Sequence, residues 1–275
     1  MDQIRDLHTE NRTEKENVVE FSLLREEDSA SLPHPAALLV HGLTASPLEM
    51  KELAKCLFEQ GYDVFVPCLG GHGTSLEDLK KVSSKQWLSD VEQAFKKINK
   101  RDYQAVFLVG QSFGAILCLY LAAKFQNKIA AVALLAPPLL LRPWHKGFAL
   151  WLLSYCPDFV LSRLGTSTKG FFDPDSLALS HYSYSRHSIG AGARLFQIAR
   201  RVKKMLKLIT APMLIVQDPE DYHVPPNVPP LIARTAINSR VEQVWANDGH
   251  HVLTKGAKHR EIYSHIVNYF ETIRE

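Results

Sequence analysis

Three kinds of feature are scarce in this sequence of 275 residues, and each scarcity argues against a class of function. The four cysteines are scattered, with no Cys-x-x-Cys pair and no metal-binding spacing, so we expect buried thiols. The formal net charge is only +3, which is too small to argue for nucleic-acid binding. Neither a signal-peptide pattern nor an apolar run long enough to span a bilayer is visible, so a cytoplasmic location is expected.

Short apolar segments recur along the chain and alternate with helical patterns. Hydrophobic residues make up 46% of the chain and charged residues 22%, as in a globular protein with one large core. The apolar segments are residues 36–40, 62–68, 105–109, 129–136, 212–217 and 241–246, and residues 18–24 resemble an edge strand. Because the segments are apolar throughout, they predict a mostly parallel, doubly wound α/β sheet covered by helices on both faces.

The most informative stretch is Gly110-Gln111-Ser112-Phe113-Gly114, which lies between a strand pattern and a helical pattern. A serine between two glycines at this spacing is typical of a nucleophile elbow, a sharp strand-to-helix turn that exposes the serine. The chain reverses so tightly there that the flanking positions cannot carry bulky side chains. Ser112 is therefore the candidate nucleophile.

A serine hydroxyl needs a base to take its proton and an acid to orient that base. In elbow-type hydrolases both partners follow the serine in the chain, on loops after later strands. The acids in the first such loop are Asp218, Glu220 and Asp221. Asp221 is preferred because it lies deeper in the loop, whereas Asp218 is placed to cap the turn. The loop after the last strand supplies His250 and His251 as candidate bases.

Acyl transfer also places negative charge on the former carbonyl oxygen, so two backbone N–H donors must be fixed beside it. The residue after the nucleophile, Phe113, supplies one donor. The loop after the first central strand reads His41-Gly42-Leu43-Thr44, and its position predicts the Leu43 amide as the second donor.

Five motifs together resemble the α/β-hydrolase superfamily, in particular the small bacterial carboxylesterases and monoacylglycerol lipases. They are HGLTASPLEM, CLGGHGTSLEDL, LVGQSFGA, LIVQDPEDYHVPP and NDGHHVLTKG. The similarity covers nearly the whole chain from about Ala36 onward. It implies Ser112 as nucleophile, Asp221 as acid, and Leu43 and Phe113 as oxyanion donors. In such families the catalytic histidine usually precedes two aliphatic residues, which favours His251, but it also often follows a glycine, which leaves His250 as the alternative.

Residues 138–207 differ in character from the rest of the chain. They hold 10 of the 26 aromatic residues and 11 Lys and Arg against 3 Asp. We expect an inserted helical cap at 138–207, an α/β-hydrolase core at 18–137 and 208–275, and a polar N-terminal arm at 1–17. The cap aromatics expected to bind substrate are Trp144, Phe148 and Trp151.

A basic amphipathic pattern ends the cap. Its apolar stripe is Leu195, Ile198, Val202 and Leu206, with Arg194, Arg201 and Lys204 on other faces. Such a helix either packs on the core with its charges solvated, or contacts an anionic membrane surface.

The sequence therefore predicts a serine hydrolase that cleaves carboxylic esters, either short- to medium-chain acyl esters or monoacylglycerol-like lipids, through an acyl-enzyme on Ser112. No metal or organic cofactor is required. A thioesterase, a lysophospholipase or a peptidase of small substrates would use the same triad. A non-catalytic ligand-binding protein with this fold would usually lack a triad residue, and candidates for all three are present here. The expected partner is a small ester or lipid rather than nucleic acid, and the oligomeric state is open.

Overall fold

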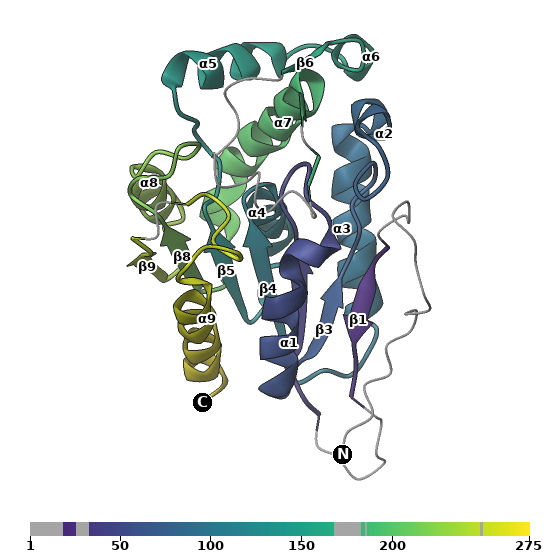
Figure 1. Ribbon diagram of the computed structural model, residues 1–275. Helices are drawn as coiled ribbons and strands as arrows, with labels where there is room; N and C mark the ends of the chain where they lie inside the picture. The colour runs from purple at the N-terminus through teal and green to yellow at the C-terminus, as the bar shows by residue number, and fades with distance from the viewer. Residues whose placement is uncertain (1–18, 26–32, 168–182, 185, 248–249) are drawn as a thin grey trace.

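A seven-stranded sheet runs through the centre of the molecule (Figure 1). The structure, a computed structural model, describes residues 19–25, 33–167, 183–184, 186–247 and 250–275. In spatial order the strands are β1 (Phe21–Leu23), β3 (Asp63–Val66), β2 (Ala36–Val40), β4 (Val106–Gln111), β5 (Ala131–Leu135), β8 (Met213–Gln217) and β9 (Val241–Trp245). Only the β1–β3 pair is antiparallel among these neighbours, so the predicted mostly parallel sheet is confirmed.

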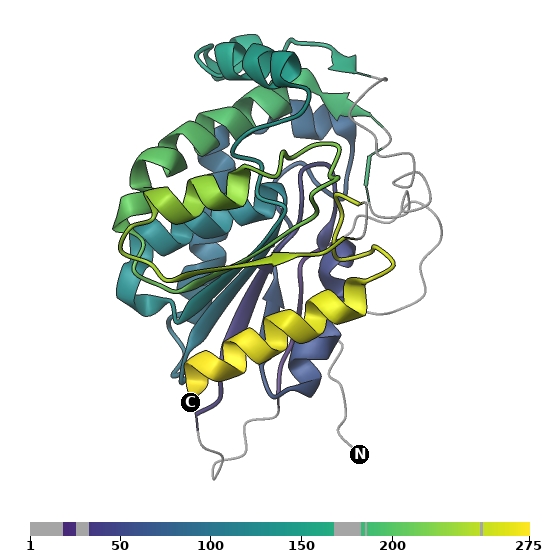
Figure 2. The same ribbon diagram turned by 90° about the vertical axis from the view of Figure 1, so that its left-hand side faces the viewer.

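Helices cover both faces of the sheet, which gives three layers (Figure 2). On one face lie α1 (Lys51–Glu59), preceded by the 3-10 turn η1 (Pro47–Met50), and α9 (His259–Arg274). On the other face lie α3 (Ser84–Ile98), α4 (Phe113–Phe125) and α8 (Val228–Thr235), with the short α2 (Leu76–Lys81) before α3 and the 3-10 turn η2 (Gln126–Lys128) after α4. Alternate residues of each central strand enter the two cores; Leu38 and Leu108 pack in one, Leu39 and Val109 in the other. Such two-sided burial explains the continuous apolar strand pattern.

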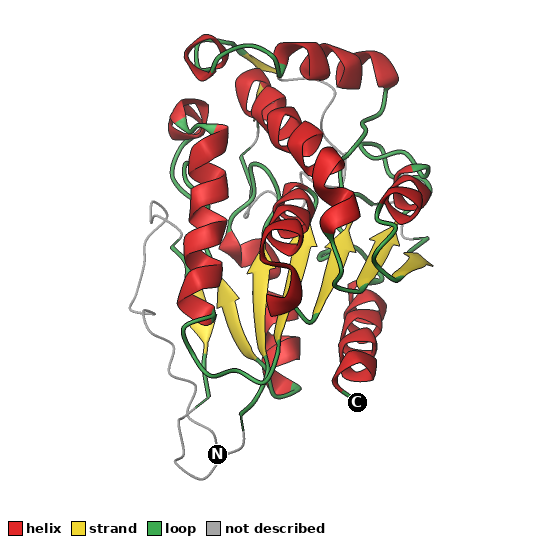
Figure 3. Cartoon of the chain, turned by 180° about the vertical axis from the view of Figure 1, so that it is seen from behind, coloured by secondary structure: helices red, strands yellow, loops and turns green. Residues whose placement is uncertain are grey.

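The chain between β5 and β8 forms a separate group of elements. They are α5 (Trp144–Leu153), α6 (Asp158–Leu161), the antiparallel pair β6 (Thr166–Ser167) and β7 (His187–Ser188), α7 (Ile189–Met205) and the turn η5 (Leu206–Leu208). Helices α5 and α6 lie beyond the carboxyl ends of the strands (Figure 3). The predicted arm at 1–17 and the aromatic residues Phe171, Phe172 and Tyr182 fall outside the described residues. A helix that could cross a bilayer is absent from the described part of the chain.

Helix α7 packs its apolar stripe inside the protein. Leu195, Ile198 and Val202 are at most 6% exposed, and the helix lies against α4 and α5. Arg194, expected on a different, solvated face, is also fully buried. Its Nε donates to Oδ1 of Asp158 at 2.9 Å and its Nη1 to the carbonyl oxygen of Lys80 at 3.0 Å. A buried guanidinium is tolerated because these acceptors replace water, and it ties α7 to α6 and α2.

The turn between β4 and α4 is tight. Ser112 has φ 52° and ψ −115°, a strained conformation for a residue with a side chain. A β-carbon on Gly110 would overlap the backbone of Gly114, and one on Gly114 would overlap the carbonyl oxygen of Val40. The elbow backbone therefore packs directly on the end of β2, and only glycine fits at either flank.

We expect Gly114→Ala to lower the free energy of unfolding by roughly 3 kcal/mol or more, because the methyl group meets backbone that cannot move aside. Urea unfolding followed by circular dichroism measures this change. Gly165→Ala is the matched control, since no atom of the described residues lies within 4 Å of a β-carbon there; its effect should stay within about 0.5 kcal/mol. An equally small effect at Gly114 would contradict the close backbone contact.

Candidate active site

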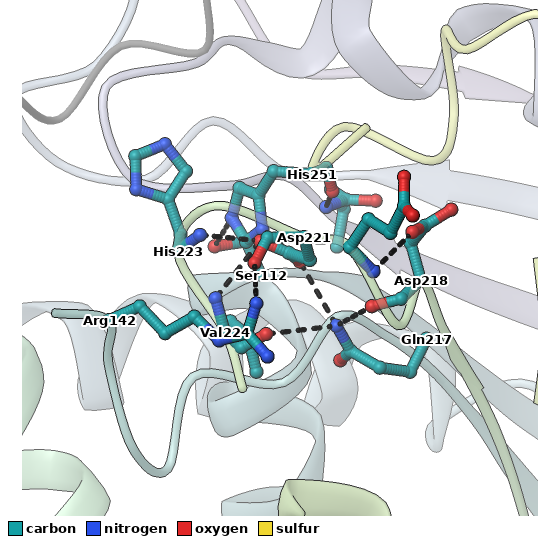
Figure 4. Close-up of polar contacts among 10 residues, drawn as sticks. Ser112, Arg142, Gln217, Asp218, Asp221, His223, Val224 and His251 are labelled. Atoms are coloured by element: carbon teal, nitrogen blue, oxygen red, sulfur yellow. Dashed lines mark hydrogen bonds and ion pairs between the residues drawn. The ribbon is translucent and has the colours of Figure 1, made fainter. Parts of the chain in front are cut away.

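Three side chains from three loops meet at the carboxyl edge of the sheet (Figure 4). Nε2 of His251 lies 2.9 Å from Oγ of Ser112, and its Nδ1 lies 2.8 Å from Oδ2 of Asp221. An ionised carboxylate only accepts hydrogen bonds, so Nδ1 carries the ring proton and Nε2 accepts from the serine hydroxyl. This is the arrangement in which the imidazole can take the proton of Ser112.

Backbone and side-chain donors hold the carboxylate of Asp221, which is fully buried. Oδ1 accepts from the amides of His223 at 2.6 Å and Val224 at 2.9 Å, and Oδ2 also accepts from Nε2 of Gln217 at 3.1 Å. Burial alone would raise the pKa of Asp221, but the neighbouring His251 and the amides of Val224 and His223 outweigh burial and hold the pKa below its ordinary value. The carboxylate is therefore charged when His251 takes up a proton.

The other candidate acid and base residues take different positions. Oδ1 of Asp218 accepts from the amide of Glu220 at 2.8 Å, as a turn-capping residue would, and Glu220 is exposed. The imidazole that reaches Ser112 is that of His251, the preferred of the two candidate bases. The structure thus brings together Ser112, Asp221 and His251, the residues that the sequence favoured as nucleophile, acid and base.

Two residues that sequence reasoning did not single out support the histidine. Nε2 of Gln111 donates to the carbonyl oxygen of His251 at 2.8 Å, so the residue before the nucleophile anchors the loop of the base. The ring of His223 packs edge-on against that of His251, with centroids 4.8 Å apart. Burial, helped by His251, lowers the pKa of His223 to about 3, so His223 stays neutral beside the base. In the sequence, the signal for Gln111 was its position directly before Ser112, and the signal for His223 was its position two residues after Asp221.

The loop that carries Leu43 lies against the elbow. A β-carbon on Gly42 would lie 3.6 Å from Cβ of Ser112. The carbonyl oxygen of Gly42 is 3.0 Å from Nδ1 of His41, and the amide of Leu69 donates to Nε2 of His41 at 3.2 Å. These partners require the proton on Nδ1, and burial lowers the pKa of His41 to about 4, which keeps the ring neutral. The Gly42 carbonyl and the Leu43 N–H belong to the same peptide group, and in a trans peptide they point in opposite directions. The hydrogen bond from Nδ1 of His41 to this carbonyl therefore also directs the N–H of Leu43.

The second expected donor, Phe113, is the first residue of α4, where backbone N–H groups have no partner within the helix. Its side chain is fully buried against Trp87, with ring centroids 4.9 Å apart. The amide is thus fixed at the start of a rigid helix beside Ser112.

The three cap residues expected to bind substrate lie on the outer surface of α5. Trp144, Phe148 and Trp151 are 77%, 51% and 37% exposed. The helix instead turns Gly147 and Leu150 inward. The structure therefore exposes these aromatic rings on the outside of the helix.

Metal-binding side chains are not gathered in the described ranges, where no group of three His, Cys, Asp or Glu residues could hold an ion.

Known proteins share both the sequence pattern and the fold. The model of the family described as "Serine aminopeptidase, S33" matches residues 32–258. The chain belongs to this family. Among curated relatives of this S33 member, the thermostable monoacylglycerol lipase of Bacillus sp. (strain H-257) is 30% identical over 220 residues, covering 79% of this chain and 82% of the lipase. The carboxylesterase of Bacillus subtilis (strain 168) is 19% identical, covering 86% of this chain and 93% of the esterase.

Solved structures add the fold of the S33 protein. A structure reported for the metagenome-derived lipolytic enzymes LipS and LipT has a TM-score of 0.77 at 23% identity, covering 94% of this chain and 98% of that one. The Paleococcus ferrophilus monoacylglycerol lipase has a TM-score of 0.70 at 18% identity, covering 88% and 96%. The expected resemblance to α/β-hydrolases of the esterase and monoacylglycerol lipase type is confirmed.

We expect His251→Gln to lower kcat about 10⁴-fold or more, because no other imidazole lies between Asp221 and Ser112. His250→Gln is the neighbouring control. It should retain activity within about tenfold, since proton transfer in the expected reaction is assigned to His251 and not to His250. Hydrolysis of p-nitrophenyl butyrate, with circular dichroism to verify folding, measures both. The reverse order of effects would show that His250 is the base.

Proposed function

We propose that this carboxylic ester hydrolase cleaves short- to medium-chain acyl esters, monoacylglycerol-like lipids among them, through an acyl-enzyme on Ser112. The observation that carries the proposal is the hydrogen-bonded series from Ser112 through His251 to the buried Asp221. The relatives named monoacylglycerol lipase and carboxylesterase support the ester class. The cytoplasm stays the expected location.

The reaction follows from the roles of these groups. Oγ of Ser112 attacks the ester carbonyl carbon while Nε2 of His251 takes the hydroxyl proton, and Asp221 stabilises the imidazolium that forms. The amides of Leu43 and Phe113 receive the oxyanion. His251 then gives its proton to the leaving alcohol, and the acyl group stays on Ser112. Water, deprotonated by His251, attacks the acyl-enzyme; the bond between the acyl carbon and Oγ of Ser112 then breaks, His251 returns the proton to that oxygen, and the carboxylic acid leaves.

The segment 138–207 is proposed as a cap that receives the acyl chain. Helices α5 and α6 lie beyond the carboxyl ends of the strands, the edge at which Ser112 is found (Figure 1). Each methylene of the acyl chain that is buried between cap and core would add about 0.8 kcal/mol to the binding free energy, so longer acyl chains bind better until the pocket is full.

A chain-length series of p-nitrophenyl esters from acetate to laurate tests this proposal. We expect kcat/KM to rise from acetate to the medium-chain esters and Ser112→Ala to abolish hydrolysis. A fluorophosphonate should label Ser112 in the wild-type protein and leave Ser112→Ala unlabelled. Wild-type protein that neither cleaves an ester at pH 8 nor takes up the label would overturn the ester hydrolase. Acyl thioesters, a lysophospholipid and a peptide amide, assayed alongside, separate the alternatives that use the same triad.

A second proposal concerns an exposed apolar surface on the cap. The aromatic surface of α5, α6 and the turn between them consists of Trp144, Phe148, Trp151, Leu152, Tyr155 and Phe159, each at least 37% exposed. Arginine side chains border it, with Arg200 3.6 Å from the ring centroid of Tyr155 and Arg163 5.8 Å from that of Phe159. Because the stripe of α7 is buried, we propose that this aromatic surface, and not α7, makes weak contact with anionic lipid surfaces.

Cosedimentation with vesicles tests the lipid contact. We expect binding to phosphatidylglycerol vesicles that weakens at high salt, and less binding to phosphatidylcholine. The double variant Phe148→Ser, Trp151→Ser should bind less, while Ile237→Ser, which changes an apolar side chain that is 74% exposed outside the cap, should bind like the wild type. Equal, negligible binding of all three proteins would leave the aromatic surface without a lipid role.

A further inference from the structure

The 3-10 turn η1 places a buried carboxyl group beside the site that the proposed reaction does not use. Glu49 is 5% exposed, and its Oε2 accepts a hydrogen bond from the amide of Gly42 at 2.7 Å. Burying a carboxyl group is costly unless hydrogen bonds replace water. The Gly42 amide supplies such a bond here, so Glu49 and the loop that carries Leu43 depend on each other.

Glu49 and Ser112 both pack against Gly42. A β-carbon on Gly42 would lie 3.5 Å from Oε2 of Glu49 and 3.6 Å from Cβ of Ser112. Gly42 is also the residue whose carbonyl oxygen is bound by Nδ1 of His41. Glu49 therefore fixes the peptide plane before Gly42, and His41 fixes the plane after it, which carries the N–H of Leu43. A glycine without these two bonds would be the most flexible residue of the loop.

Charged and titratable groups from several elements surround Glu49. His251 and Lys255, on the loop before α9, and Tyr263 on α9 interact electrostatically with Glu49. Glu52 on α1 in turn interacts with Lys255 and with His259 and Arg260 on α9. Glu52 accepts a hydrogen bond from Nζ of Lys255 at 2.8 Å and lies 3.6 Å from Nε2 of His259, so it competes with Glu49 for the positive charge of Lys255. Burial raises the pKa of Glu49 to about 7, although the Gly42 amide, His251 and Lys255 act in the opposite direction. Its charge thus changes in the pH range in which an esterase is assayed.

We propose that Glu49 is a positioning residue for ester hydrolysis: it holds the Gly42 amide so that the N–H of Leu43 points at the oxyanion, and its negative charge favours the protonated His251 that forms during the reaction. This inference rests on the proposed roles of Ser112, His251 and Leu43. The two actions are separable, because a glutamine side chain keeps a hydrogen-bond acceptor for Gly42 and lacks the charge.

Three variants, assayed with p-nitrophenyl butyrate from pH 5 to 9, test the two actions. Glu49→Ala should lower kcat about 10- to 100-fold with KM within about twofold, because a misdirected oxyanion donor weakens only the transition state. Glu49→Gln should recover most of kcat at pH 9. The pH at which its kcat/KM falls to half of the maximum should be about 0.5 unit lower than in the wild type, since without the negative charge of Glu49 His251 binds its proton less tightly. Glu59→Gln, an exposed carboxyl at the end of α1, is the matched control.

The outcomes distinguish this inference from the proposed function. Wild-type protein without esterase activity or fluorophosphonate labelling would overturn the proposed function. An active wild type with Glu49→Ala and Glu49→Gln both behaving like Glu59→Gln would overturn only the role of Glu49. Glu49→Gln no more active than Glu49→Ala at pH 9 would overturn the hydrogen-bond role. An unchanged pH profile in Glu49→Gln would overturn the charge role, and this profile decides it even where Glu49→Ala fails to fold.

Discussion

The contact between two stretches of backbone, the elbow and the end of β2, is the constraint on which the site depends. Strands β2 and β4 are parallel neighbours with Val40 opposite Gly110, so the loops that follow them leave the sheet side by side. Because Gly114 has no side chain, the elbow approaches the Val40 carbonyl oxygen closely enough to bring Ser112 beside Gly42. The strained conformation of Ser112 persists because both sheet pairing and helix α4 hold its neighbours.

Several polar side chains are buried around this contact, and hydrogen bonds to nearby loops hold the carboxylates among them. Asp221 and Glu49 each accept hydrogen bonds from backbone amides of the loops they stabilise. The rings of His41 and His72 touch, with centroids 4.9 Å apart, and burial lowers their pKa values to about 4 and about 3. Neutral imidazoles add no competing positive charge, so in the proposed reaction His251 is the imidazole that becomes positively charged. Local hydrogen bonds thus set geometry and charge together.

The sequence predicted the features that short patterns encode. The elbow, the central strands and the choice of Asp221 and His251 rest on glycine spacing and on the order of loops after strands, which are local signals. Helix α8 was not predicted, because Val228-Pro229-Pro230 resembles a loop; proline is nevertheless tolerated in the first helical turn. The six-residue α2 is too short to show a periodic pattern. Gln111, His223 and Glu49 escaped notice because their partners are supplied by tertiary structure.

Amphipathic periodicity states that a helix has an apolar face but does not say what covers it. In α7 the stripe of Leu195, Ile198 and Val202 is taken up by packing within the protein, and Arg194 is neutralised by Asp158, 36 residues away. Helix α5 is apolar at most of its positions, so its sequence does not say which side packs inward; Gly147 and Leu150 are buried, whereas Trp144 and Phe148 stay exposed. The exposed apolar surface that we propose for lipid contact is therefore what remains after the core is packed, and only the packed structure places exposed apolar residues on α5.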